Sequence, residues 1–160
     1  EEWSRGPNTF LGYLGEPELT RKDFDPDGWY HSGDLARMLP DGSIRISGRI
    51  KDIIVRGGQN ISVSEVESYL SAHPAVHSVA VVGIPHARLG ETGCAVVVTK
   101  PGQTLALNDL TDFLSAKGVA KFKLPEKLEI WPSLPTTPSG KIQKYLIRKR
   151  LSEHEGGDNA

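Results

Sequence analysis

Residues 135–141, Pro-Thr-Thr-Pro-Ser-Gly-Lys, form the stretch whose residue types are best suited to chemistry. Its two prolines restrict the backbone and remove amide donors, and Ser139 and Gly140 restore freedom immediately before Lys141. The pattern predicts a solvated loop that holds one cation at its tip, which suits a phosphate that binds and is then released. Taken alone, the same stretch is more typical of a surface turn before a C-terminal helix.

Three further clusters combine glycine with charged or polar residues: residues 28–34 (GWYHSGD), 48–52 (GRIKD) and 56–60 (RGGQN). In the first, Asp34 offers an acceptor-only carboxylate that can bind both hydroxyls of a sugar diol. In the second, Arg49 can bind the same diol or a phosphate. The glycines of the third leave few side chains, so a ligand can pass close to the backbone. Each cluster also has an ordinary structural alternative, which is respectively an Asx turn, a hairpin with solvated charges and a flexible connector.

Familiar phosphate and metal motifs are absent from the sequence. A P-loop needs glycine where Pro135 stands and serine or threonine where Ile142 stands. No G-x-G-x-x-G follows a predicted strand, so a dinucleotide-binding fold has no support. The five histidines are dispersed and Cys94 has no partner cysteine, so we predict no metal site in this chain.

The composition narrows the class of protein. A net charge of -1 over 160 residues argues against a general nucleic-acid-binding surface, and the basic run 148–150 is too short to change that. The single cysteine favours a reducing cytoplasm. No apolar run approaches the length of a transmembrane segment.

The composition and the predicted secondary structure around these clusters differ between the first 47 residues and the rest of the chain. Residues 1–47 are rich in glycine, proline and aspartate. From residue 48 on, predicted helices and strands alternate, as expected for one small α/β domain. Ser62 and Glu65 form a candidate capping box at the start of one helix, Asn108 is a candidate cap for the next, and the last helix is expected to begin near Lys141.

The four clusters occur in a fixed order, at 28–34, 48–52, 56–61 and 134–141. Together they resemble the C-terminal third of an adenylate-forming enzyme, the ANL superfamily of acyl-CoA synthetases, luciferases and peptide-synthetase adenylation domains. The sequence of the third cluster is most similar to that of AMP-forming acyl-CoA synthetases and fatty-acid–CoA ligases.

The resemblance implies an α/β (α+β) fold. Residues 1–48 would be a trailing β-rich segment of a large N-terminal domain. Residues 49–152 would be the mobile C-terminal lid domain, a mixed sheet flanked by helices, and residues 153–160 a disordered tail.

The resemblance also implies an activity. Enzymes of this family activate a carboxylic acid with ATP, forming an acyl-adenylate, and most then transfer the acyl group to a thiol such as CoA. By the resemblance, Asp34 and Arg49 would bind the nucleotide, ATP or AMP, and Lys51 would be the domain hinge. Gly57, Gly58 and Gln59 would line the CoA tunnel. Lys141 would be the catalytic cation. Mg²⁺ is expected as well, with its ligands in the large N-terminal domain.

The chain is therefore expected to be a fragment that is inactive without its own N-terminal domain, because the family's ATP loop and acyl pocket lie upstream. Uncovered aromatic residues of 1–47 would then be free to mediate homo-oligomer formation, namely Phe10, Tyr13, Trp29 and Tyr30. Two alternatives stay open: an adenylation domain that loads a carrier protein, and a non-catalytic α/β interaction module that binds no nucleotide.

Overall fold

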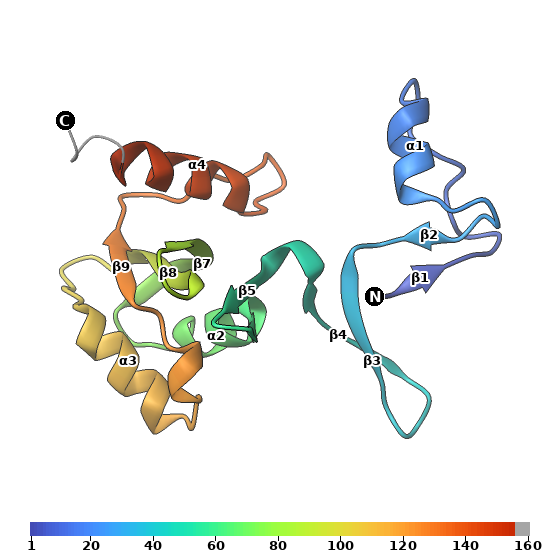
Figure 1. Cartoon of the computed structure of the whole chain (residues 1–160). Coiled ribbons are helices and arrows are strands. Elements are labelled where there is room, and N and C mark those ends of the chain that lie inside the picture. The colour runs from blue at the N-terminus through green and yellow to red at the C-terminus, as the bar shows by residue number, and fades with distance from the viewer. Residues whose placement is uncertain (156–160) are drawn as a thin grey trace. The chain divides into compact units, whose positions relative to one another are not determined.

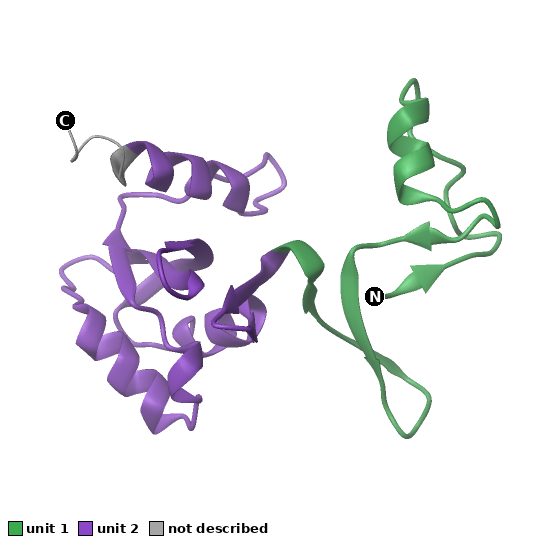
Figure 2. Ribbon diagram, viewed as in Figure 1, with its two compact units in different colours: residues 1–51 green, residues 52–160 purple. Residues whose placement is uncertain are grey.

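The computed structural model describes residues 1–155. Its contacts divide the chain into two compact units, residues 1–51 and 52–160, which Figure 2 shows in different colours. We call them unit 1 and unit 2. None of the helices within residues 1–155 is long and apolar enough to cross a membrane.

Unit 2 is built on a five-stranded mixed sheet (Figure 1). The central strand is β8. It pairs antiparallel with β7 along its length and parallel with β9, and it pairs antiparallel with β5 where Arg56 faces Gly90. The edge strand β6 pairs with β5. The strands are β5 (Ile53–Arg56), β6 (Gln59–Ser62), β7 (Val76–His86), the central β8 (Gly90–Thr99) and β9 (Lys127–Ile130).

Both faces of this sheet are buried, because successive side chains of a strand point to opposite faces. In β7, Val79 and Val81 belong to one core cluster, whereas Ala80 and Val82 belong to another. The central strand β8 divides its side chains between the same two clusters. A strand pair buried on both sides reads in sequence as a nearly continuous apolar run.

The helices of unit 2 cover the two faces separately. Helices α2 (Val63–Leu70) and α3 (Leu107–Ala116) contribute to the first cluster, and α4 (Lys144–Glu155) contributes Ile147 and Leu151 to the second. In Figure 1, α3 and α4 lie on opposite sides of the strands. The mixed sheet flanked by helices confirms the predicted α/β fold.

Unit 1 is made of short elements and has no residue that is fully buried; the buried core of the described chain begins at Ile54. It contains two separate two-stranded antiparallel sheets and one short helix. A short 3-10 helix, η1 (Ile50–Asp52), follows its last strand. The other elements are β1 (Trp3–Ser4), α1 (Pro17–Asp23), β2 (Tyr30–His31), β3 (Asp34–Met38) and β4 (Ile44–Arg49).

The aromatic residues of unit 1, which are scattered in the sequence, meet in one cluster. The Phe10 ring lies 4.9 to 5.2 Å from the rings of Tyr13, Phe24 and Tyr30, in edge-to-face arrangements. Phe10 itself is still 41% exposed, and Leu11 and Leu14 beside it are fully exposed. Unit 1 is therefore held by aromatic contacts and hairpin pairing, with an apolar surface left uncovered.

The division between the two units falls between Lys51 and Asp52, three residues after the end of the expected N-terminal segment 1–48. Strand β4 continues to Arg49, which pairs with β3, and the Ile50 amide then donates to the Gly33 carbonyl. These backbone hydrogen bonds keep residues 49–51 with unit 1.

Two predicted helix caps are wrong. Ser62 holds the N-cap position of α2, but its side chain makes no capping hydrogen bond, and the Glu65 carboxylate accepts instead from Lys123 Nζ at 2.8 Å. Asn108 lies inside α3, where Asp109 caps the helix by accepting from the Ala106 amide at 2.8 Å. For Glu65 the fold supplies a charged donor from a distant part of the chain, whereas Asp109 caps α3 locally.

The structure describes the first three residues of the expected C-terminal tail, 153–155. Helix α4 continues through Glu155, so residues 153–155 are helical. The rest of the predicted tail, residues 156–160, lies outside the described residues.

A substitution on α4 tests the assignment of its inner face. Ile147 has no exposed surface and packs in the cluster that contains Trp131. We expect Ile147→Ala to lower the free energy of unfolding by about 2–5 kcal/mol, because it leaves a cavity in that cluster. Urea unfolding followed by tryptophan fluorescence, to which Trp131 contributes, measures the change. Tyr145→Ala is the control on the same helix, since Tyr145 is 62% exposed, and should cost less than about 0.5 kcal/mol; similar losses in both variants would contradict the assignment.

Candidate functional site

The loop at residues 135–141 is an ordered turn. The Thr137 amide donates to the Lys141 carbonyl at 2.8 Å, and the Lys141 amide donates to Thr137 Oγ1 at 3.1 Å. Thr136 and Ile142 form an isolated antiparallel bridge at its base. Gly140 has a φ of 82°, a left-handed conformation that glycine adopts without a steric penalty. The turn therefore ends directly before Lys141.

Lys141 is exposed, and among residues 1–155 its ammonium has no carboxylate partner. The next helix, α4, begins at Lys144 and not at Lys141 as predicted. The intervening residues close the turn instead, because the Gln143 amide donates to the Pro135 carbonyl at 2.9 Å. The result is a solvated cation on a short, hydrogen-bonded support.

Asp34 and Arg49, which are distant in sequence, lie directly opposite each other on strands β3 and β4. Arg49 Nε donates to Asp34 Oδ1 at 2.5 Å. The Asp34 side chain is 27% exposed and the Arg49 side chain 50% exposed. Unit 1 thus presents a partly exposed carboxylate that a guanidinium orients from across the hairpin.

Lys51 is exposed and lies in η1, at the last position of unit 1. The residue that follows it, Asp52, is the first of unit 2. One turn of 3-10 helix at this junction is a short element, and not the interior of a long rigid one. This position suits a pivot, since hinges are a few residues at the ends of elements.

Gly57 and Gly58 form a two-residue hairpin turn between β5 and β6, with Arg56 paired to Gln59. Both glycines have positive φ, 55° and 79°, as a tight hairpin requires. The cluster is therefore a defined turn, and not the flexible connector that its composition also allowed. Gly58 has open space where a side chain would stand, whereas Gly57 lies close to Leu89.

The turn is fixed by its neighbours. The Gly57 amide donates to the Leu89 carbonyl at 2.8 Å. The Arg56 guanidinium forms an ion pair with Glu126, and its hydrogen bonds lower the pKa of the Glu126 carboxyl. These contacts therefore fix the position of the turn and of the open space beside Gly58.

Three charged residues that the sequence analysis did not single out join in one group in unit 2. Lys144 Nζ lies 3.0 Å from Glu67 Oε2 and 3.7 Å from Asp52 Oδ2. Each is an ordinary residue type in a helix or beside a turn, so no spacing in the sequence indicates the group. Only the adjacency of Asp52 to Lys51, and of Lys144 to the Lys141 loop, hinted at it.

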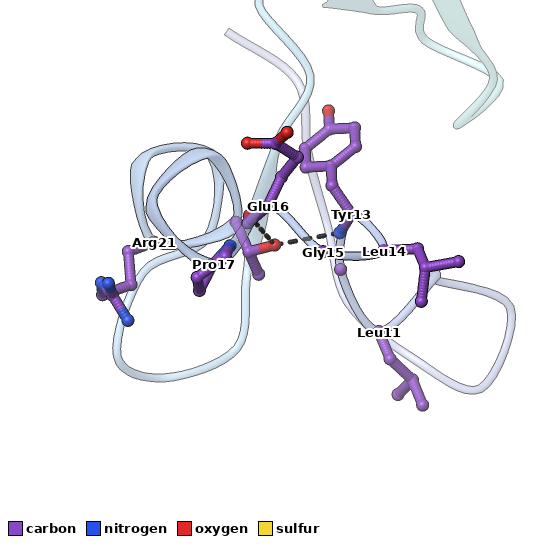
Figure 3. A pocket seen from close by; sticks show the side chains of 9 residues that line it. Leu11, Tyr13, Leu14, Gly15, Glu16, Pro17 and Arg21 are labelled. Carbon is purple, nitrogen blue, oxygen red and sulfur yellow. Dashed lines mark hydrogen bonds between the residues drawn. The ribbon is translucent and has the colours of Figure 1, made fainter.

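The described residues contain no metal-ligand cluster, and a surface hollow of unit 1 contains none of the predicted site residues. Among residues 1–155, no three His, Cys, Asp or Glu side chains are grouped so that they could hold a metal ion. Figure 3 shows a hollow in unit 1, lined mainly by residues 11–17 together with Thr20 and Arg21. None of the predicted site residues lines it. The hydrogen bonds drawn there, from the Tyr13 amide to Thr20 Oγ1 and from that hydroxyl to the Glu16 carbonyl, stabilise the local fold.

Comparison with known proteins points to the same chemistry as the motifs. Residues 65–141 match the family of the AMP-binding enzyme C-terminal domain. The medium-chain fatty-acid–CoA ligase of Escherichia coli K12 is 55% identical over 152 residues, which are 94% of this chain and 27% of that protein. The salicyl-AMP ligase / salicyl-S-ArCP synthetase of Mycobacterium tuberculosis is 45% identical over 92% of this chain and 26% of its own length. This chain therefore spans about a quarter of these relatives.

The fold agrees with that of a solved adenylate-forming enzyme. The crystal structure of ATP-bound MatB from Rhodopseudomonas palustris matches with a TM-score of 0.81 and 39% identity, over 91% of this chain and 29% of the other. Because motif order, family match and fold agree, residues 65–141 belong to the AMP-binding enzyme C-terminal domain family, and the chain is related to the C-terminal part of adenylate-forming acyl-CoA ligases.

Proposed function

We propose that the chain is the C-terminal part of an AMP-forming acid–CoA ligase, which activates a carboxylic acid of the fatty-acid class with ATP and transfers the acyl group to CoA in the cytoplasm. The observation that carries the proposal is Lys141, an exposed cation on an ordered turn, without a carboxylate partner among residues 1–155. The similarity to a medium-chain fatty-acid–CoA ligase supports the choice of acid and acceptor.

Lys141 would act in the first half-reaction. When the acid's carboxylate attacks the α-phosphorus of ATP and pyrophosphate leaves, negative charge accumulates on the non-bridging phosphate oxygens. A placed cation stabilises that charge in the transition state. A lysine serves as a point charge without a bidentate requirement, and an exposed position lets it withdraw before a thiol attacks the acyl-adenylate.

The other predicted residues would bind the nucleotide, allow the domain to rotate between the two half-reactions, and line the path of CoA. Asp34 would accept hydrogen bonds from the ribose hydroxyls, with Arg49 orienting its carboxylate. Lys51 would be the pivot of the small domain. Gly57, Gly58 and Gln59 would line the path of the CoA pantetheine arm, and the open side of Gly58 supports this. Mg²⁺ would be bound by residues of the large N-terminal domain.

A carrier protein is the alternative acceptor. It is favoured by the similarity to the salicyl-AMP ligase / salicyl-S-ArCP synthetase, whose name describes loading of a carrier. The test is whether the enzyme that contains this domain transfers its acyl group to free CoA or only to a carrier. Calorimetry with AMP on the same enzyme distinguishes a ligase, with either CoA or a carrier protein as acceptor, from a non-catalytic module, which would bind no nucleotide.

Replacing Lys141 should impair one half-reaction selectively. In the enzyme that contains this domain, we expect Lys141→Ala to slow acyl-adenylate formation by about 10²–10³-fold, as for loss of one transition-state charge donor. Thioester formation from supplied acyl-adenylate and CoA should stay near the parent rate. Pyrophosphate release and thioester formation measure the two steps. Lys149→Ala, an exposed lysine on α4, is the control; equal loss of both half-reactions in Lys141→Ala would refute the proposed role.

A side chain at Gly58 should impair the opposite half-reaction. Asn tolerates a left-handed backbone better than most residues, so Gly58→Asn adds bulk on the open side with little strain. We expect slower transfer to CoA and unchanged adenylation. Gly118→Asn is a matched control, because Gly118 also has a φ of 79° and open space around it. If the two variants transfer acyl groups to CoA equally well, the tunnel assignment fails.

The 160-residue chain alone should form no measurable acyl-adenylate. It supplies Lys141 and the Asp34–Arg49 pair, whereas we expect the ATP loop and the acyl pocket in the large N-terminal domain. Pyrophosphate release by the purified chain with ATP and a medium-chain fatty acid measures this. Turnover comparable to that of a complete ligase would show that the chain contains those sites.

A further inference from the structure

A compact group of opposite charges links the start of unit 2 to the start of α4. The Lys144 ammonium lies between two carboxylates, 3.0 Å from Glu67 Oε2 and 3.7 Å from Asp52 Oδ2. One helical turn later, Arg148 lies 3.2 Å from Asp52 Oδ1. The group thus joins η1, α2 and α4, elements that are far apart in sequence.

The members of this group are well shielded from water. The side chains of Lys144, Glu67 and Asp52 are only 17%, 19% and 25% exposed. Glu67 also accepts a hydrogen bond of 2.7 Å from the Val81 amide of β7, which ties the group to the sheet. Burial raises the pKa of the Glu67 carboxyl. Shielded charges that keep their partners fix geometry more strongly than exposed ion pairs do.

Lys144 is in an unfavourable place for a lysine by local rules. It is the first residue of α4, where the positive end of the helix dipole repels a cation. The two carboxylates compensate for this repulsion. A local conflict that only tertiary contacts resolve indicates that the position serves something other than helix formation.

The two ends of the group adjoin the two moving parts of the proposed mechanism. Asp52 directly follows Lys51, and Lys144 follows the Lys141 turn closely. We propose that Asp52, Glu67 and Lys144 are positioning residues that fix the base of the Lys141 turn to the first residue of unit 2, so that rotation at Lys51 moves Lys141 by a defined amount. This inference rests on the proposed function of Lys141 and Lys51.

The physical consequence is precise placement of Lys141. A solvated cation at the end of a turn is only as well placed as the turn's base. A misplacement of about 1 Å can cost roughly 10²-fold in rate. Loss of the group should therefore affect the step that uses Lys141 and spare the step that does not.

The main experiment uses the enzyme that contains this domain, with Lys144→Met, which keeps the apolar stem and removes the charge. We expect the kcat of adenylation to fall by about 10–10²-fold, with KM for ATP changed less and thioester formation from supplied acyl-adenylate retained. Lys144→Arg should restore most of the rate, because a guanidinium can also bridge two carboxylates. Lys149→Met, on the exposed side of the same helix, is the matched control and should match the parent enzyme.

A second measurement reports the position of the turn directly. Hydrogen exchange of the 160-residue chain should be faster at the amides of Thr137, Gly140 and Lys141 in Lys144→Met, and unchanged in β7 and β8. Asp52→Asn, which keeps the side-chain shape, should give the same pattern if Lys144→Met does not fold. Exchange that rises throughout unit 2 would indicate general destabilisation and overturn the inference.

The outcomes separate this inference from the proposed function. If the parent enzyme forms no acyl-adenylate, the proposed function fails, and the exchange comparison still tests the group. If the parent enzyme is active and Lys144→Met adenylates at the parent rate, or loses both half-reactions equally, the positioning role is refuted.

Discussion

The burial of the β7–β8 pair on both faces is the constraint on which unit 2 depends. Val79 and Val81 face α2 and α3, whereas Ala80 and Val82 face α4. Since each strand must supply apolar side chains to both faces, polar groups are confined to strand ends, turns and the solvent side of the helices. The Gly57–Gly58 turn and the Lys141 turn lie at such positions, at the margin of the buried core.

Unit 1 is organised by a different interaction. It has no fully buried residue, and an edge-to-face aromatic cluster around Phe10 together with short hairpins holds it together. Its one chemically marked feature, the Asp34–Arg49 pair, lies on the β3–β4 hairpin, where antiparallel pairing places the two residues opposite each other. The register of a single hairpin is therefore sufficient to join the carboxylate and the guanidinium.

Two lysines that are close in sequence differ in their exposure and in their carboxylate partners. Lys141 is exposed and has no carboxylate partner within residues 1–155, which leaves its charge available to a ligand. Lys144 is 17% exposed and its charge is taken by Glu67 and Asp52. The motif order therefore supports the proposal that Lys141 is the group that acts on the nucleotide. The contacts of Lys144 support the proposal that it positions the turn.

The sequence alone determined the fold class, the order of the motifs and the family, because alternating apolar runs and glycine-marked clusters are local properties of the chain. It placed the caps of α2 and α3 on Ser62 and Asn108. In α2 the Glu65 carboxylate instead takes a partner that only the fold supplies, and in α3 the neighbouring Asp109 is the cap. Tertiary structure decided that Lys123 takes Glu65, that Arg49 faces Asp34, and that Lys144 lies between Asp52 and Glu67. The partners of Lys123 and Lys144 are distant in sequence, whereas Arg49 and Asp34 meet through the register of one hairpin. The free energy of each pairing depends on distance and burial, which no local pattern encodes.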